Sequence, residues 1–358
     1  MNVKTLSVIL LIGAMLITAG FRISIVVHKS VLTHDDSISY LAATCHEGDL
    51  VSRLQSGDAP FNQWVPASAW KEFLSIKSSG CFISISYDLG HYDMHPPLYF
   101  WVLHFWLLIF GVGITTGVWL NVLTAVLTCL GIWYLARQIF DDGRYAGIAA
   151  VIWAVSAGPL AATLESRPYE LLALVTVIYA IQMGRIVDSK RNSLFQFIFL
   201  FLTLVAGLLT HYIFVLIVVP ASWFMLLFSV KRLRRILLYS GVLCVSLLSA
   251  YLLHQNFWYS FVGQSQRMLT LSGGVLVEKM WQTLQTLGQF FGVYPFNIAV
   301  GIMVLGVIIF FIVLDWRQGQ RYAHSHSRQK AVLFFYYCCS LVILRHIFCF
   351  GRTCRQST

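Results

Sequence analysis

The chain has few charged residues for its length. Of its 358 residues only 11% are Asp, Glu, Lys or Arg, while 58% are hydrophobic. Soluble globular domains carry about 25% charged residues, so the composition excludes an ordinary soluble enzyme. Several apolar runs of roughly 16–20 residues are long enough to approach the thickness of a bilayer. The sequence therefore predicts an all-α polytopic membrane protein.

Acidic residues are the scarcer charged type, with 15 Asp and Glu against 25 Lys and Arg and a net charge of +10. In a soluble protein this excess suggests nucleic acid, but in a membrane protein basic loops set the orientation. Internal repeats, low-complexity tracts and Cys/His clusters with zinc spacing are also lacking. We therefore expect the chain to contact membrane lipids and not to bind nucleic acid.

Hydropathy predicts about nine transmembrane helices. The expected spans are residues 5–27, 118–135, 145–162, 168–184, 194–209, 213–230, 236–253, 297–314 and 331–349. The first follows Lys4 and is interpreted as a retained span rather than a cleaved signal peptide, because no small-x-small cleavage site precedes the polar loop. The connecting loops are rich in Arg and Lys.

The apolar run Leu98–Phe110 decides the orientation. If it crossed the membrane, the later basic loops would face outward, against the positive-inside rule. As a helix the run is only about 20 Å long, shorter than the roughly 30 Å hydrocarbon core. We therefore expect a juxtamembrane helix on the outer face, beginning at Pro96–Pro97, and a second one at 279–291. The outer loop 28–117 is expected to carry part of a site.

The end of the chain fits this scheme badly. Residues 1–330 are interpreted as one membrane domain, and 331–358 as a last apolar segment with an atypical basic, Cys-containing tail. The tail would place Arg345, Arg352 and Arg355 outside, which leaves open an altered or truncated C-terminus. In the outer loop, Cys45 and Cys81 form a disulfide if the compartment is oxidising, or remain two independent thiols.

Four groups of polar residues are candidates for a site, and the predicted topology places all four on the outer face at one depth. Each also has a structural explanation: a helix cap for the acidic pair, a mutual ion pair for the Glu and the Arg, interfacial belt residues, and a cap for the juxtamembrane helix. The groups are Asp35 with Asp36, Glu165 with Arg167, His211 with Tyr212, and Asp93 with His95.

In this order, the acidic pair, His-Pro-Pro-Leu-Tyr, Glu-x-Arg-x-Tyr and Thr-His-Tyr resemble the membrane glycosyltransferases with a C-type fold. The similarity is nearest to the bacterial protein O-mannosyltransferases and the lipid A aminoarabinose transferases, and covers roughly residues 5–230. It implies sugar transfer from a polyprenyl-phosphate carrier to a protein, lipid or glycan acceptor, with inversion. The place would be the outer, periplasmic side of the inner membrane.

The resemblance also implies roles for single residues. Asp35 matches the family's catalytic Asp, and Asp36 stands where relatives have Glu, so both are candidate catalytic residues. Thr33 and His34 replace an aromatic lead. The Glu-x-Arg-x-Tyr positions fall on Glu165, Arg167 and Tyr169. An arginine matches a phosphate well, so Arg167 is expected to hold the donor phosphate. Lys71 and Lys77 are candidate helpers in this role.

Two questions stay open at this stage. Asp35, Asp36 and Glu165 offer the hard oxygen ligands that Mg²⁺ or Mn²⁺ prefers, yet metal-independent enzymes of this superfamily exist. The alternatives to an enzyme are a membrane transporter or lipid flippase, or an inactive scaffold of glycosyltransferase type. Transporters place ionisable residues at mid-membrane, whereas here the acids gather at the outer face or in loops, which favours the enzyme.

Overall fold

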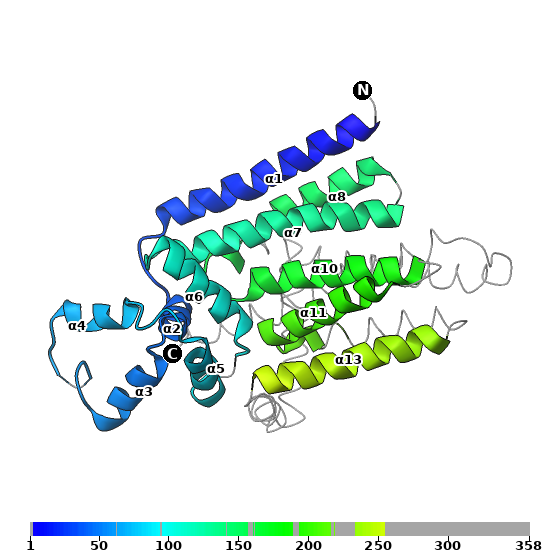
Figure 1. Cartoon of the computed structure of the whole chain (residues 1–358). Helices are drawn as coiled ribbons and strands as arrows, with labels where there is room; N and C mark the ends of the chain where they lie inside the picture. The colour runs from blue at the N-terminus through cyan, green and yellow to red at the C-terminus, as the bar shows by residue number, and fades with distance from the viewer. Residues whose placement is uncertain are drawn as a thin grey trace, which may run out of the picture. The chain divides into compact units, whose positions relative to one another are not determined.

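The computed structural model describes residues 3–254, with gaps at 62, 94, 141, 157–159, 161, 189–192, 216–217 and 219–232. Every regular element in these ranges is a helix (Figure 1). The elements are α1 (Val3–His28), α2 (His34–Ala43), α3 (Glu47–Ser56), α4 (Ala67–Lys71), η1 (Glu72–Leu74), α5 (Phe82–His91), α6 (Leu98–Phe110), α7 (Thr116–Phe140), α8 (Gly143–Val155), α10 (Tyr169–Asp188), α11 (Leu194–Thr210) and α13 (Leu233–Leu253).

Four of the described helices are long and apolar enough to cross a bilayer. They are Thr5–His28 in α1, Thr116–Phe140 in α7, Tyr169–Ile186 in α10 and Ile236–Leu253 in α13. The all-α membrane class is therefore confirmed in this part of the chain, but the count of nine spans is not. The predicted spans 297–314 and 331–349, most of 213–230, the helix at 279–291 and the domain boundary at 330 lie outside the described residues.

Two further predicted spans correspond to shorter apolar helices, α8 and α11. Helix α8 was expected to continue to about residue 162, yet it ends at Val155, where Ser156 caps it with a backbone N–H to Trp153 O. Thirteen residues extend about 20 Å, less than the hydrocarbon core. Pro159, which cannot continue a regular helix, follows closely in the sequence.

The long helices pack along one another. Helix α1 packs against α7 and α8, α7 against α10, and α11 lies between α10 and α13 (Figure 1). Small residues allow the closest approach. A Cβ on Gly143 would collide with Ser7, and one on Gly147 would collide with Leu10. This is the packing expected in a bilayer, where small residues let helix backbones come near.

Helix α6 begins and ends where the sequence predicts. Pro97 is its N-cap residue, and no side chain caps it, so neither Asp93 nor His95 serves the capping role considered above. Helix α6 contacts α2, α7 and α11, and it buries Tyr99, Phe100 and Leu107. It is therefore a core element of the outer-loop region, with α2 and α5 beside it (Figure 1).

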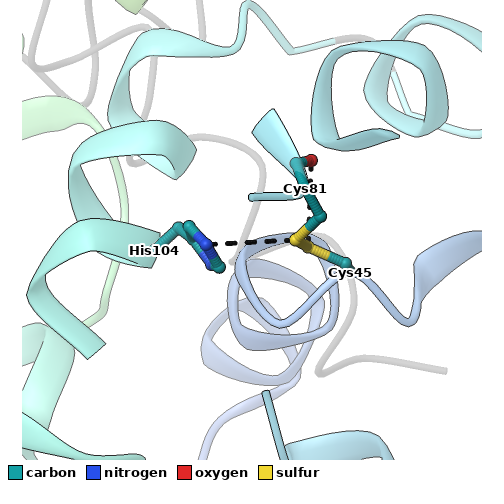
Figure 2. Close-up of side chains that lie close together, drawn as sticks. All are labelled: Cys45, Cys81 and His104. Carbon is teal, nitrogen blue, oxygen red and sulfur yellow. Dashed lines mark hydrogen bonds between the residues drawn. A yellow bond between two sulfur atoms is a disulfide. The ribbon is translucent and has the colours of Figure 1, made fainter. Parts of the chain in front are cut away.

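A disulfide closes this region. Cys45 follows α2 with a positive φ of 67°, and it is bonded to Cys81 at the start of α5, with 6.4 Å between their Cα atoms. Figure 2 shows the His104 ring of α6 beside the sulfur pair, with Nε2 3.9 Å from Cys81 Sγ. Its Nδ1 lies 2.7 Å from Ala43 O. The bond links α2 to α5 against α6, so the open question about these two cysteines is answered by a disulfide.

Candidate active site

Three residues of the bend Leu164–Arg167 before α10 are each held by a different neighbour. Lys29, just after α1, donates to Leu164 O at 2.9 Å. Asn121 of α7 donates its side-chain amide to Glu165 O. The Ser166 N–H donates to Asp36 Oδ1 of α2 at 2.7 Å. Such a bend has no helical hydrogen bonds of its own, so these contacts fix its backbone.

Helix α7 comes very close to this bend. A Cβ on Gly117 would collide with the Ser166 side chain, so only glycine permits the contact. The Tyr40 hydroxyl of α2 accepts from Gly117 N–H and donates to Gly113 O, both at 2.7 Å. Helices α2 and α7 are therefore fixed to each other at the point where the bend passes between them.

Asp36 is the centre of this arrangement. Its side chain is fully buried, and Oδ2 accepts from Lys29 Nζ at 2.6 Å and from the backbone and hydroxyl of Thr33, both at 2.9 Å. Thr33 in turn caps α2 by accepting from the Asp36 N–H, which completes a capping box. Burial alone would raise the pKa of this carboxyl. The hydrogen bonds from Lys29, Ser166 and Thr33 outweigh that effect and hold the pKa below its usual value.

A second polar network lies below the bend, inside the membrane-spanning part of α1. Arg22 is fully buried, and its Nε donates to Thr163 Oγ1 at 2.8 Å. Its Nη2 lies 3.4 Å from Glu170 Oε1 of α10, and the Thr163 hydroxyl donates to the same oxygen at 2.7 Å. A charge in the bilayer is costly unless paired, so this network ties α1 to both sides of the bend.

Arg167, at the end of the bend, meets the segment before α6. Its Nη2 donates to His95 Nε2 at 3.0 Å, and His95 Nδ1 lies 2.8 Å from Asp93 Oδ1. An arginine has no acceptor, so His95 Nε2 must be unprotonated and its ring proton faces Asp93. The structure thus joins Arg167 of one predicted group to His95 and Asp93 of another in one chain of contacts.

His95 also lies near His211, the C-cap residue of α11, with 6.1 Å between the two ring centroids. The ring of Tyr169, the first residue of α10, lies 6.2 Å from the His211 ring, measured between centroids. Burial, together with the positive charge of Arg167, lowers the pKa of His211 to about 3. His211 is therefore neutral at physiological pH, and it accepts from Ile213 N–H at Nδ1, which places its proton on Nε2.

Tyr212 points elsewhere in the bundle. Its hydroxyl lies 3.0 Å from Nε2 of His254, which follows α13, and the two rings are stacked. Burial lowers the pKa of His254 to about 4, so this imidazole is neutral and binds the phenol as a neutral partner. His254 was not predicted, because a single histidine at the end of an apolar run has no sequence signal of its own.

Arg167 has hydrogen-bond donors without a partner in the described part of the chain. Its side chain is only 6% exposed, yet Nε and Nη1 have no hydrogen-bond partner among the described residues. Glu165, two residues earlier, is also buried. A buried guanidinium with two unused donors is costly unless a ligand satisfies it, and its planar fork matches a phosphate or carboxylate. This feature makes Arg167 the centre of the candidate site.

Asp35 differs from its neighbour Asp36. It lies in the first turn of α2 and is partly exposed, whereas Asp36 is buried in the bonds described above. Lys71 and Lys77, the other predicted phosphate ligands, are exposed. Lys77 donates to both oxygens of Asp49 at 2.9 and 2.7 Å. Lys29 was missed, because it lies between the first span and the acidic pair and has the appearance of a flanking interfacial lysine.

Glu47, the first residue of α3, was also missed by sequence reasoning. It is 7% exposed, and its Oε2 has no hydrogen-bond partner in the part of the chain described here. Burial, with the nearby charges of Asp93 and Asp88, raises its pKa to about 8, an effect that Arg167 opposes. The only sequence signal was its place two residues after Cys45, which the disulfide fixes.

A metal site formed by Asp35, Asp36 and Glu165 remains a prediction from the sequence. Among the described residues, the one His/Cys/Asp/Glu group with ligand atoms within 4.8 Å of one another is Cys45, Cys81 and His104. Its two sulfur atoms are bonded to each other (Figure 2), so they are not thiolates, the form that binds a metal. Asp36, moreover, has both oxygens engaged by protein donors.

Comparison with known protein families gives a match to part of the chain. A family model described as dolichyl-phosphate-mannose-protein mannosyltransferase matches residues 94–254, somewhat under half of the chain. Neither the curated proteins nor the solved structures give a match. The matched range begins just before His95 and includes the bend, α10, α11 and His211. The resemblance to membrane mannosyltransferases expected from the motifs is thereby confirmed in this part of the chain.

Proposed function

We propose that this membrane protein transfers a sugar from a polyprenyl-phosphate carrier to an acceptor hydroxyl or amine, in a single displacement that inverts the anomeric centre. The observation that carries the proposal is Arg167, a buried arginine with two unused donors, held on a fixed bend inside the matched range. A carrier phosphate at the outer membrane surface has the charge and the planar oxygen pairs that such a guanidinium binds.

In the proposed reaction Arg167 holds the phosphate. As the bond between the anomeric carbon and the phosphate oxygen breaks, positive charge develops on the sugar and negative charge on the departing lipid phosphate. A guanidinium already fixed by His95 and by the backbone of the bend needs little rearrangement to stabilise that charge. His211, which lies near Arg167, stays neutral. The positive charge that would meet the phosphate is therefore that of Arg167.

Asp35 is the proposed general base. It takes the proton of the acceptor group while that group's oxygen or nitrogen forms its bond to the anomeric carbon, and the polyprenyl phosphate leaves with the electrons of the broken bond. A single displacement requires the base on the face opposite the leaving group, as in inverting glycosidases. Asp36 is proposed as a positioning residue, because its lone pairs are occupied by Lys29, Thr33 and Ser166.

The proposed location of the reaction is the outer face of the cell membrane. The Cys45–Cys81 disulfide supports this side, since disulfides persist in oxidising compartments such as the periplasm. A flippase or transporter is less well supported. The buried acid described inside a span, Glu170, has its Oε1 bonded to Arg22 and Thr163, which joins α1 to α10 and gives this acid a structural role.

Transfer from labelled donors tests the proposal. Membranes from cells that express the full chain are supplied with polyprenyl-phosphate sugars carrying radiolabelled mannose, glucose, galactose or aminoarabinose. Label is then measured in protein, lipid and glycan fractions. We expect one donor to give transfer, and Asp35→Asn to lower the rate by a factor of roughly 10² to 10⁴, the usual contribution of a general base.

The control is Asp58→Asn, which changes an exposed acid of the same loop whose carboxylate accepts from the hydroxyl of nearby Ser56. This variant should transfer at the wild-type rate. A folded Asp35→Asn protein with undiminished transfer would remove Asp35 as the base. Failure of the folded wild-type chain with every donor would remove the proposed activity.

A further inference from the structure

Glu47 is a buried acid that the proposed mechanism does not yet use. It begins α3, two residues after the disulfide-bonded Cys45, and the next residue, Gly48, donates its N–H to Asp88 Oδ2 at 3.2 Å. A Cβ on Gly48 would come within 2.9 Å of the same carboxylate. The disulfide on one side and this contact on the other therefore fix where the Glu47 side chain begins.

Charged groups from three other elements act on this carboxyl. They are Asp88 of α5, Asp93 in the segment before α6 with its neighbour His95, and Arg167 in the bend before α10. On its own side, Lys77 Nζ and His46 Nδ1 both contact Asp49, while His46 Nε2 has no hydrogen-bond partner among the described residues. Arg167 is thus the cation that faces Glu47, although two acids face it as well.

The side chains of Glu47 and Arg167 each keep buried polar atoms that form no hydrogen bond, either with each other or with other described residues. Oε2 of Glu47, and Nε and Nη1 of Arg167, have no partners among the described residues, although both side chains are more than nine-tenths buried. A direct bidentate pair would be the usual arrangement for a buried carboxylate and guanidinium. An unpartnered acceptor and two unpartnered donors, on buried side chains whose charges act on each other, indicate a place for a ligand with several oxygen atoms.

We propose that Glu47 is a second ligand of the donor phosphate, and that it binds in its protonated form by donating a hydrogen bond to a phosphate oxygen beside Arg167. This inference rests on the proposed function, since it takes Arg167 as the phosphate-binding residue. The ligand chemistry is that of a phosphate monoester or diester, the group at the head of a polyprenyl-phosphate carrier.

The protonation state follows from the surroundings. Burial, Asp93 and Asp88 raise the pKa of Glu47 to about 8, so the carboxyl is mostly neutral at pH 7. An arriving phosphate adds further negative charge and favours the neutral form still more. A protonated carboxyl has one O–H donor, which an ionised carboxylate lacks. Above pH 8 Glu47 becomes a negative neighbour that repels the phosphate and competes for Arg167.

The test is binding of farnesyl phosphate, a short polyprenyl phosphate, to the purified full chain between pH 7 and 9.5. The second ionisation of a phosphate monoester lies near pH 6, so the probe itself changes little in this range. We expect the wild-type Kd to rise about tenfold from pH 7 to 9, because one proton must be retained for binding and the site titrates near 8.

Three variants separate the explanations, each checked for a wild-type melting midpoint. Glu47→Gln keeps a neutral N–H donor, and should bind as wild type at pH 7 but without the alkaline loss. Glu47→Ala should bind roughly tenfold more weakly at pH 7, the effect of losing a hydrogen bond to a charged group. Glu72→Gln changes an exposed acid paired with Arg53, and should keep the wild-type pH dependence.

Two results would overturn the inference: an alkaline loss that persists in Glu47→Gln, or wild-type affinity at pH 7 in Glu47→Ala. Arg167→Ala distinguishes this failure from that of the proposed function. If Arg167→Ala loses affinity while both Glu47 variants bind as wild type across the pH range, only the role of Glu47 falls. If Arg167→Ala also binds farnesyl phosphate normally, the phosphate assignment itself falls.

Discussion

Replacing Asp36 by Asn separates positioning from catalysis within the acidic pair. Asp36 accepts four hydrogen bonds, three at Oδ2 from Lys29 and Thr33 and one at Oδ1 from Ser166. An Asn side chain has one accepting oxygen and a donating amide. Whichever way it turns, either the Ser166 N–H or the group around Thr33 and Lys29 loses its acceptor, and the positive charge of Lys29 loses its counter-ion.

The magnitude follows from burial. Asp36 is fully buried and Lys29 is 9% exposed, so the pair is screened far less than a surface ion pair. Removing one partner of a buried ion pair costs about 3–5 kcal/mol. Asp35→Asn leaves these bonds in place. We therefore expect Asp36→Asn to lower both stability and transfer, and Asp35→Asn to lower transfer alone.

The assay is thermal melting of the detergent-solubilised chain, followed by circular dichroism, beside the transfer assay. The lowered pKa of Asp36 means that its contribution is present above its unfolded pKa near 3.8 and is lost as the pH falls through the folded value. The gap in melting midpoint between wild type and Asp36→Asn should be constant from pH 6 to 8 and close in strong acid. An Asp36→Asn protein that melts like wild type but transfers 10² to 10⁴ times more slowly would refute the reasoning.

Two further predictions concern the phosphate site and the orientation. Arg167→Ala should abolish most donor binding, while Arg167→Lys should keep part of it through charge and lose the bidentate geometry; equal, wild-type binding in both would make Arg167 a structural residue. The orientation is tested with a chain that keeps the bonded Cys45 and Cys81, lacks the other six cysteines and carries one new cysteine, in place of either Ser56 or Ser189. In intact cells an impermeant maleimide should label only the cysteine at position 56. Labelling at 189 but not at 56 would reverse the proposed orientation.

The sequence predicts most helices in the described part, because their cause is local. Pro97 and Gly111 set the beginning and the end of the apolar run Leu98–Phe110, and α6 has these limits. The end of α8 at Val155 was less predictable. Hydropathy averages over a window and continues through an apolar stretch, even where the backbone leaves the helix.

The site was only partly predictable, because its contacts join residues far apart in the chain. The predicted topology puts Arg167 and His95 on one face, but their 3.0 Å contact across 72 positions depends on how the segments before α6 and before α10 meet. Glu47 and Lys29 have no motif, and their roles come from the disulfide and from the bend. Residues that serve a site through burial and packing leave little trace in composition or spacing.

The division between Asp35 and Asp36 was nevertheless open to prediction from the sequence. Successive residues on a helix point about 100° apart, so two adjacent acids cannot both face the same neighbour. Thr33 stands three positions before Asp36, which is the spacing of a capping box, with Asp in the place of Glu or Gln. The acid at that position turns back toward the start of the helix, and here toward Lys29 and Ser166. Its neighbour Asp35 stands about 100° further around the helix, so the two acids are expected to have different surroundings and different roles.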